Sequence, residues 1–140
     1  MAEAKPRGNF LGMPRREDTV PAIVGRAYDF VLWLLPKVDN FPKAHRFTVG
    51  ERLTANGLDL LTTLVEAAYS RDKAELLQMA NRKINSTRYL LRLAKDMRLM
   101  SIDSYGFSAE KLDEIGRMAG GWHKAASQRP KHPADGAVAP

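Results

Sequence analysis

A chain of 140 residues, with hydrophobic and charged fractions of 44% and 27%, is large enough for one globular domain that buries roughly two-thirds of its unfolded surface. The absence of cysteine excludes disulfides, thiolate catalysis and cysteine-ligated zinc. Lys and Arg number 22 against 16 Asp and Glu, and the net charge of +6 favours polyanionic or acidic partners.

Both ends of the sequence lack the apolar periodicity of packed structure. Residues 1–17 mix charges with glycine and proline, and residues 127–140 contain three prolines. We predict two flexible tails, which leaves residues 18–126 as the folded domain. No apolar run approaches the ~20 residues of a membrane-spanning helix, and the N-terminus has no signal-peptide pattern. We therefore expect a cytoplasmic protein.

The first half of the folded domain shows the periodicity of two helices. Asp18 or Thr19 can cap the first helix, and Pro36 is expected to end or kink it. Thr48 and Glu51 have the spacing of a capping box at the start of the second helix. Apolar residues at three- and four-residue steps predict the buried faces: Ile23, Ala27, Phe30, Val31 and Leu34 in the first helix, and Leu53, Leu60, Leu61, Leu64 and Ala68 in the second.

The second half predicts two further helices, one from about Asp72 to Leu99 and one that begins near Ser108. Their buried faces are predicted at Leu76, Leu77, Ala80, Ile84, Leu91 and Ala94, and at Leu112, Ile115, Ala119 and Trp122. Four amphipathic helices with short connections predict an all-α fold, an antiparallel up-down four-helix bundle.

Glycines in the last helix indicate close packing. Gly116 and Gly120 are four residues apart, so one helical face has no side chains there and another helix could approach it. Trp122 follows and needs burial. We expect these three residues to pack against a neighbouring helix, and Glu114 to pair with Arg117.

No pattern in the sequence indicates catalysis or metal binding. The three histidines, His45, His123 and His132, have neither HExxH nor Glu-x-x-His spacing, and we interpret them as surface residues. A P-loop and a nucleophile elbow are also missing. We expect no enzymatic activity, no cofactor and no metal.

The third helix carries most of the positive charge. Residues 71–100 contain eight Lys or Arg and three acids, an excess of five that leaves positive charges without local partners. Arg88, Arg92 and Lys95 lie within roughly 60° of one another around the helix; we call them the basic row, and Arg98 continues it. Lys43, Arg46 and Arg52 form a second group, which we call the basic turn. The charges are either a solvated face or a surface for salt-sensitive phosphate binding with weak sequence preference.

Three segments of the sequence carry a family resemblance. "FPKAHRFTVGERL" (41–53), "LLRLAKDMRLMSIDSY" (90–105) and "LDEIGRMAGGWHK" (112–124) together resemble the accessory variability determinant (Avd) proteins of diversity-generating retroelements. The resemblance covers about residues 20–125, and "EIGRMAGGW" is its most specific part. The "FPK" connection and the Arg-rich third helix are shared with four-helix-bundle proteins encoded in ribosomal RNA intervening sequences.

The resemblance implies a non-catalytic four-helix bundle that assembles as a homopentameric barrel. It implies a basic surface that engages a reverse transcriptase and binds nucleic acid, template RNA or cDNA, during mutagenic reverse transcription. That surface would fall on the basic row with Arg98, and secondly on the basic turn. The alternative is a scaffold related to the intervening-sequence proteins, which acts through protein–protein contacts only.

Overall fold

The structure, a computed structural model, describes residues 21–128, and all regular structure in that range is helical. The four long helices are α1 (Ala22–Asp39), α3 (Glu51–Ala68), α4 (Ala74–Asp96) and α5 (Ile102–Gln128). A single helical turn, α2 (Lys43–His45), and a π-helical turn, η3 (Arg46–Gly50), lead directly into α3. The predicted helical bundle is therefore present. The predicted tails lie outside the described residues, except that α5 extends through residues 127 and 128.

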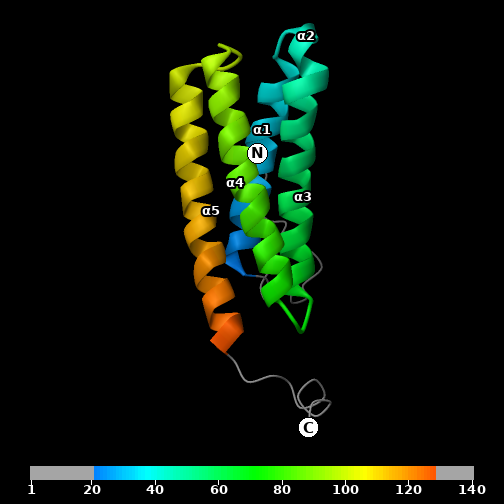
Figure 1. Ribbon diagram of the computed structural model, residues 1–140, viewed down its shortest axis with the longest axis vertical. Helices are drawn as coiled ribbons and strands as arrows, with labels where there is room; N and C mark the ends of the chain where they lie inside the picture. The colour runs from blue at the N-terminus through cyan, green and yellow to red at the C-terminus, as the bar shows by residue number, and fades with distance from the viewer. Residues whose placement is uncertain (1–20, 129–140) are drawn as a thin grey trace, which may run out of the picture.

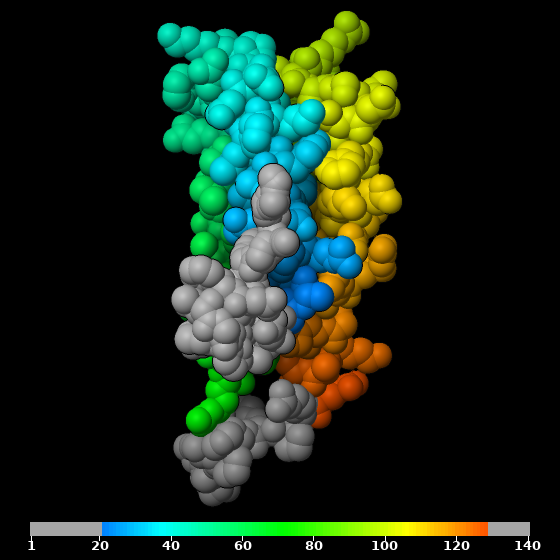
Figure 2. Space-filling view, turned by 180° about the vertical axis from the view of Figure 1, so that it is seen from behind, coloured from blue at the N-terminus to red at the C-terminus, as the bar shows by residue number. Residues whose placement is uncertain are grey.

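Figure 1 shows the long helices side by side, with the α3–α4 connection at one end of the bundle. The opposite end carries α2, η3 and the α4–α5 connection, and we call it the basic end. Seen from the other side, α1 lies between α3 and α5 (Figure 2), in agreement with its contacts to both. Segments that are about 50 residues apart in sequence, such as those around residues 46 and 98, thus lie at the same end of the molecule.

The core consists largely of the predicted apolar faces. Every predicted residue of α1 is buried, as are the predicted residues of α4 and α5 apart from Leu76 and Trp122, which are half-buried. In α3, Leu61 and Ala68 are likewise half-buried, because they lie about 100° around the helix from the buried Leu60 and Ala67; Leu61 still packs against the core. The face of α3 that meets both α1 and α4 is centred on Leu53, Leu60 and Leu64, which are fully buried.

Two helix boundaries differ from the prediction. Pro36 lies inside α1, which continues to Asp39. Pro36 and Leu32 are both exposed, so water can satisfy the Leu32 carbonyl that proline leaves without a donor. α5 begins at Ile102, six residues before Ser108, because the Ser101 hydroxyl accepts a hydrogen bond from the Ser104 N–H at 3.0 Å. The proposed caps of α1, Asp18 and Thr19, lie outside the described residues.

The capping box predicted at Thr48 and Glu51 is wrong, because the helix starts earlier. It begins after Pro42, and the Thr48 hydroxyl donates to the carbonyl of His45 at 3.3 Å. Gly50 then packs tightly: a Cβ there would lie 2.9 Å from Val38 Cγ1. The absence of this side chain lets the π-helical turn rest against the end of α1 and fixes the position of the residues before it.

Candidate polyanion-binding surface

The basic row lies along the seam between α4 and α5, where two of its three members are already paired. Arg88 Nη2 lies 3.0 Å from Asp113 Oδ1 on α5, and Lys95 Nζ lies 3.3 Å from Asp96 Oδ1 and 4.8 Å from the centre of the Tyr105 ring. The expected lack of local partners counted only the acids within residues 71–100, and Asp113, the partner of Arg88, lies outside that segment.

Other charges of α4 and α5 also find partners on neighbouring helices. Lys83 pairs with Asp59 of α3 at 3.3 Å. Glu114 pairs with Arg26 of α1 at 3.3 Å, so the predicted pairing of Glu114 with Arg117 is not the one observed. Arg92 alone in the basic row is exposed and without an ion-pair partner in the described part of the chain.

The glycines of α5 lie in different surroundings. A Cβ at Gly116 would lie 3.1 Å from Arg88 Nη2 and 3.8 Å from Ile84 Cγ2, so this glycine leaves room for Arg88 to cross α5 toward Asp113. A Cβ at Gly120 would meet no heavy atom of the described residues within 4 Å. Among those residues, the expected close helix contact is therefore absent at Gly120. Trp122 is half-buried, and Lys73 Nζ lies 5.6 Å from the centre of its ring.

The basic turn presents its charges to solvent. Lys43 and Arg46 project from α2 and η3, and Arg52 from the first turn of α3. All three are exposed, and none has an ion-pair partner within residues 21–128. Phe47 lies among them and is 64% exposed. Sequence reasoning missed Phe47, although an aromatic residue next to basic residues in "KAHRF" is a recognisable feature of single-strand binding surfaces.

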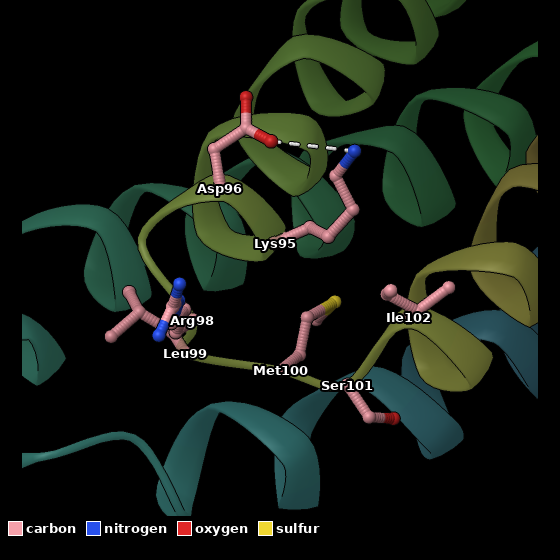
Figure 3. Close-up of a pocket in the computed structure, with 7 residues that line it drawn as sticks. All are labelled: Lys95, Asp96, Arg98, Leu99, Met100, Ser101 and Ile102. Atoms are coloured by element: carbon pink, nitrogen blue, oxygen red, sulfur yellow. Dashed lines mark ion pairs between the residues drawn. The ribbon is translucent and has the colours of Figure 1, made fainter.

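The α4–α5 connection adds a shallow hollow to the basic end. The hollow has a volume of about 700 Å³, is widely open to solvent and is lined by Lys95, Asp96, Arg98, Leu99, Met100, Ser101 and Ile102. Figure 3 shows the Lys95–Asp96 ion pair on one side of it and Met100 and Ile102 on the other. This end of the bundle therefore combines unpaired cations with exposed apolar side chains.

Arg98 is held in an unusual backbone conformation at this hollow. Its φ is 63°, and among the described non-glycine residues it alone has a positive φ. The Arg98 N–H donates to the Lys95 carbonyl at 2.9 Å and the Leu99 N–H to the Ala94 carbonyl at 2.8 Å. This is the Schellman arrangement, in which the residue at the position of Arg98 is usually glycine. An arginine in this left-handed conformation costs about 1 kcal/mol relative to glycine. Because strained backbone conformations cluster at functional sites, we interpret Arg98 as a candidate functional residue.

We expect Arg98→Gly to raise the free energy of unfolding by roughly 0.5–1 kcal/mol, because glycine adopts this conformation without strain. The same change removes one charge from the basic end and should weaken polyanion binding. Urea unfolding and fluorescence anisotropy measure the two effects. Arg92→Gly is the matched control: it also removes an exposed arginine, but it lies inside α4 and should destabilise by about 1 kcal/mol. A destabilised Arg98→Gly variant would contradict the conformation described.

Two faces of the bundle carry exposed apolar residues that lie outside the predicted core-facing stripes. On α4 and at its C-cap, Tyr89, Leu93 and Met97 follow one another at four-residue steps and are 70%, 44% and 38% exposed. On α1, Tyr28 and Leu32 are 57% and 62% exposed. Apolar residues gathered on the outer face of a helix are typical of surfaces that another chain covers.

Neither a metal site nor a membrane span is found within residues 21–128. No three His, Cys, Asp or Glu side chains there lie close enough to hold a metal ion, and no helix in that range is long and apolar enough to cross a bilayer. His45 and His123 are half-buried, so they are less exposed than the surface residues that we expected. His132 lies outside the described residues.

Comparison with known proteins agrees with the resemblance seen in the sequence. A family model described as bAvd-like matches residues 22–126, from the start of α1 almost to the end of α5. No curated protein and no solved structure matched the chain. The matched region covers well over half of the 140 residues and contains all three segments that carry the resemblance. The chain therefore belongs to the bAvd-like family.

Proposed function

We propose that this protein is a non-catalytic accessory protein of a diversity-generating retroelement. It binds the reverse transcriptase and nucleic acid, template RNA or cDNA, in the cytoplasm and thereby supports mutagenic reverse transcription. Membership of the bAvd-like family supports the retroelement context. The observation that carries nucleic-acid binding is a set of exposed cations at the basic end that have no ion-pair partner among residues 21–128: Lys43, Arg46, Arg52 and Arg98.

The assembly that we propose is a pentamer of antiparallel up-down four-helix bundles. Exposed apolar residues on α1 and α4, such as Leu32 and Tyr89, support contacts between subunits. A closed ring would repeat the basic end of each subunit around one axis, and the summed potential would exceed that of a single bundle. Light scattering of the purified protein measures the subunit number, and a monomer at micromolar concentration would contradict this arrangement.

Nucleic-acid binding is tested by anisotropy titrations with single-stranded RNA, single-stranded DNA and duplex DNA across a salt series. We expect the logarithm of the affinity to fall linearly with the logarithm of the salt concentration, with a slope near −0.7 per phosphate contacted on a single strand. Co-expression with the reverse transcriptase of the same locus tests the second partner. Failure to bind any polyanion at low salt would contradict the nucleic-acid part of the proposal.

A second candidate function is a scaffold that contacts only proteins. The apolar row Tyr89, Leu93 and Met97 on α4 and at its C-cap favours it, as does the internal pairing of Arg88 with Asp113. The two functions differ in one result: the scaffold would retain the reverse transcriptase on co-purification but would bind no RNA or DNA at low salt.

A further inference from the structure

The turn formed by α2 and η3 holds one aromatic side chain away from the core. The N–H groups of His45 and Arg46 both donate to the Pro42 carbonyl, at 2.8 and 3.1 Å, which starts the helix. Gly50 at the other end of the turn is buried against Val38. Between these two fixed points, Phe47 is 64% exposed. π-helical turns of this kind are found frequently at functional sites.

Phe47 differs in its surroundings from three other exposed aromatic residues, Phe107, Tyr89 and Tyr28. Phe107 packs against Trp33, with ring centres 5.1 Å apart. Tyr89 and Tyr28 each lie one helical turn before an exposed leucine, Leu93 or Leu32. Phe47 has no ring partner in the described part of the chain.

The neighbours of Phe47 are cations. Lys43 lies three residues before Arg46 and four before Phe47, so it is one helical turn from both, and Arg46 precedes Phe47 directly in the chain. All three are exposed, and neither cation has an ion-pair partner within residues 21–128. An open aromatic ring flanked by free cations matches the chemistry of a nucleotide, which offers a flat base and a negative phosphate.

We propose that Phe47 is a stacking platform for one base of a single-stranded nucleic acid, with Lys43 and Arg46 bound to the adjoining phosphates. This assignment rests on the proposed nucleic-acid binding and specifies where the strand lies and in which form. A duplex stacks its bases on one another, so only an unpaired strand can place a base on the ring. Because Pro42 and Gly50 hold the turn in place, the protein loses little conformational entropy in this turn when the strand binds.

The test compares Phe47→Leu with wild-type protein in anisotropy titrations against an unstructured RNA oligonucleotide. Loss of one base–aromatic stack should lower the affinity about tenfold without changing the salt slope, because no charge is removed. Lys43→Gln combined with Arg46→Gln should instead reduce the steepness of the slope by about 1.4. Duplex DNA should bind the Phe47→Leu variant as well as it binds wild type.

Tyr69→Leu is the matched control, since Tyr69 is 55% exposed at the α3–α4 connection, the end of the bundle opposite Phe47, and its loss should leave RNA affinity unchanged. Phe47→Trp should retain binding, and its added fluorescence should be quenched when a base stacks on it. An unchanged affinity of folded Phe47→Leu, in a protein that does bind RNA, would overturn the stacking assignment and leave the proposed function intact. Absence of RNA binding by the wild-type protein would overturn both.

Discussion

Replacement of Lys43, Arg46 and Arg52 by glutamine is expected to lower the affinity for single-stranded RNA on the order of 100-fold at about 50 mM salt. The three side chains are exposed and unpaired within residues 21–128, so their charges are available to phosphates. Each phosphate contact on a single strand contributes about 0.7 to the salt slope, so the slope should become shallower by about 2. Anisotropy across a salt series measures both quantities, and circular dichroism checks that helicity is unchanged.

The matched control replaces the basic row, Arg88, Arg92 and Lys95, by glutamine. It removes the same formal charge, but Arg88 is already paired with Asp113 and Lys95 with Asp96. Of these three, only Arg92 has no ion-pair partner in the described part of the chain, so the slope should change by about 0.7. A larger loss of affinity in this control than in the basic-turn variant would move the binding surface to the α4–α5 seam.

Leu34→Ala is expected to lower the free energy of unfolding by about 3 kcal/mol, because Leu34 of α1 is fully buried against α3. A Cβ at Gly57 would lie 2.9 Å from Leu34 Cδ2 and 3.7 Å from Val31 Cγ2, so side chains of α1 pack directly against the α3 backbone at this point. Gly57→Ala alone should therefore cost about 1 kcal/mol through overpacking. In the Leu34→Ala background the same change should stabilise, because the new methyl group occupies part of the cavity.

Urea unfolding of the wild type, both single variants and the double variant gives the coupling between the two positions. Gly25→Ala serves as the control, since a Cβ at Gly25 would meet no heavy atom of the described residues within 4 Å. At this position in the first turn of α1, alanine should raise the free energy of unfolding by about 0.5 kcal/mol. Equal stabilisation by Gly57→Ala and Gly25→Ala would show that α1 and α3 do not approach closely at Gly57.

The sequence by itself determined the helices and most of the core. Ile23, Phe30 and Leu34 repeat at helical steps, and all three are buried in α1; the same holds for Leu112 and Ile115 in α5. Such patterns can be recognised in the sequence because the apolar side chains on one face of each helix are buried on folding. The α-helix has 3.6 residues per turn, which sets the spacing of these residues. The three segments that resemble Avd proteins were also sufficient to indicate the family, which the match over residues 22–126 confirms.

Only the tertiary structure decided which polar and charged residues are free to act. Asp113 is 25 positions from Arg88 in sequence yet forms an ion pair with it. Likewise Arg26, not Arg117, is the partner of Glu114. The capping box failed for a similar reason, since Gly50 packs on Val38 and the helix starts at an earlier residue. Periodicity describes one helix at a time, whereas ion pairs between helices depend on which faces the folded chain brings together.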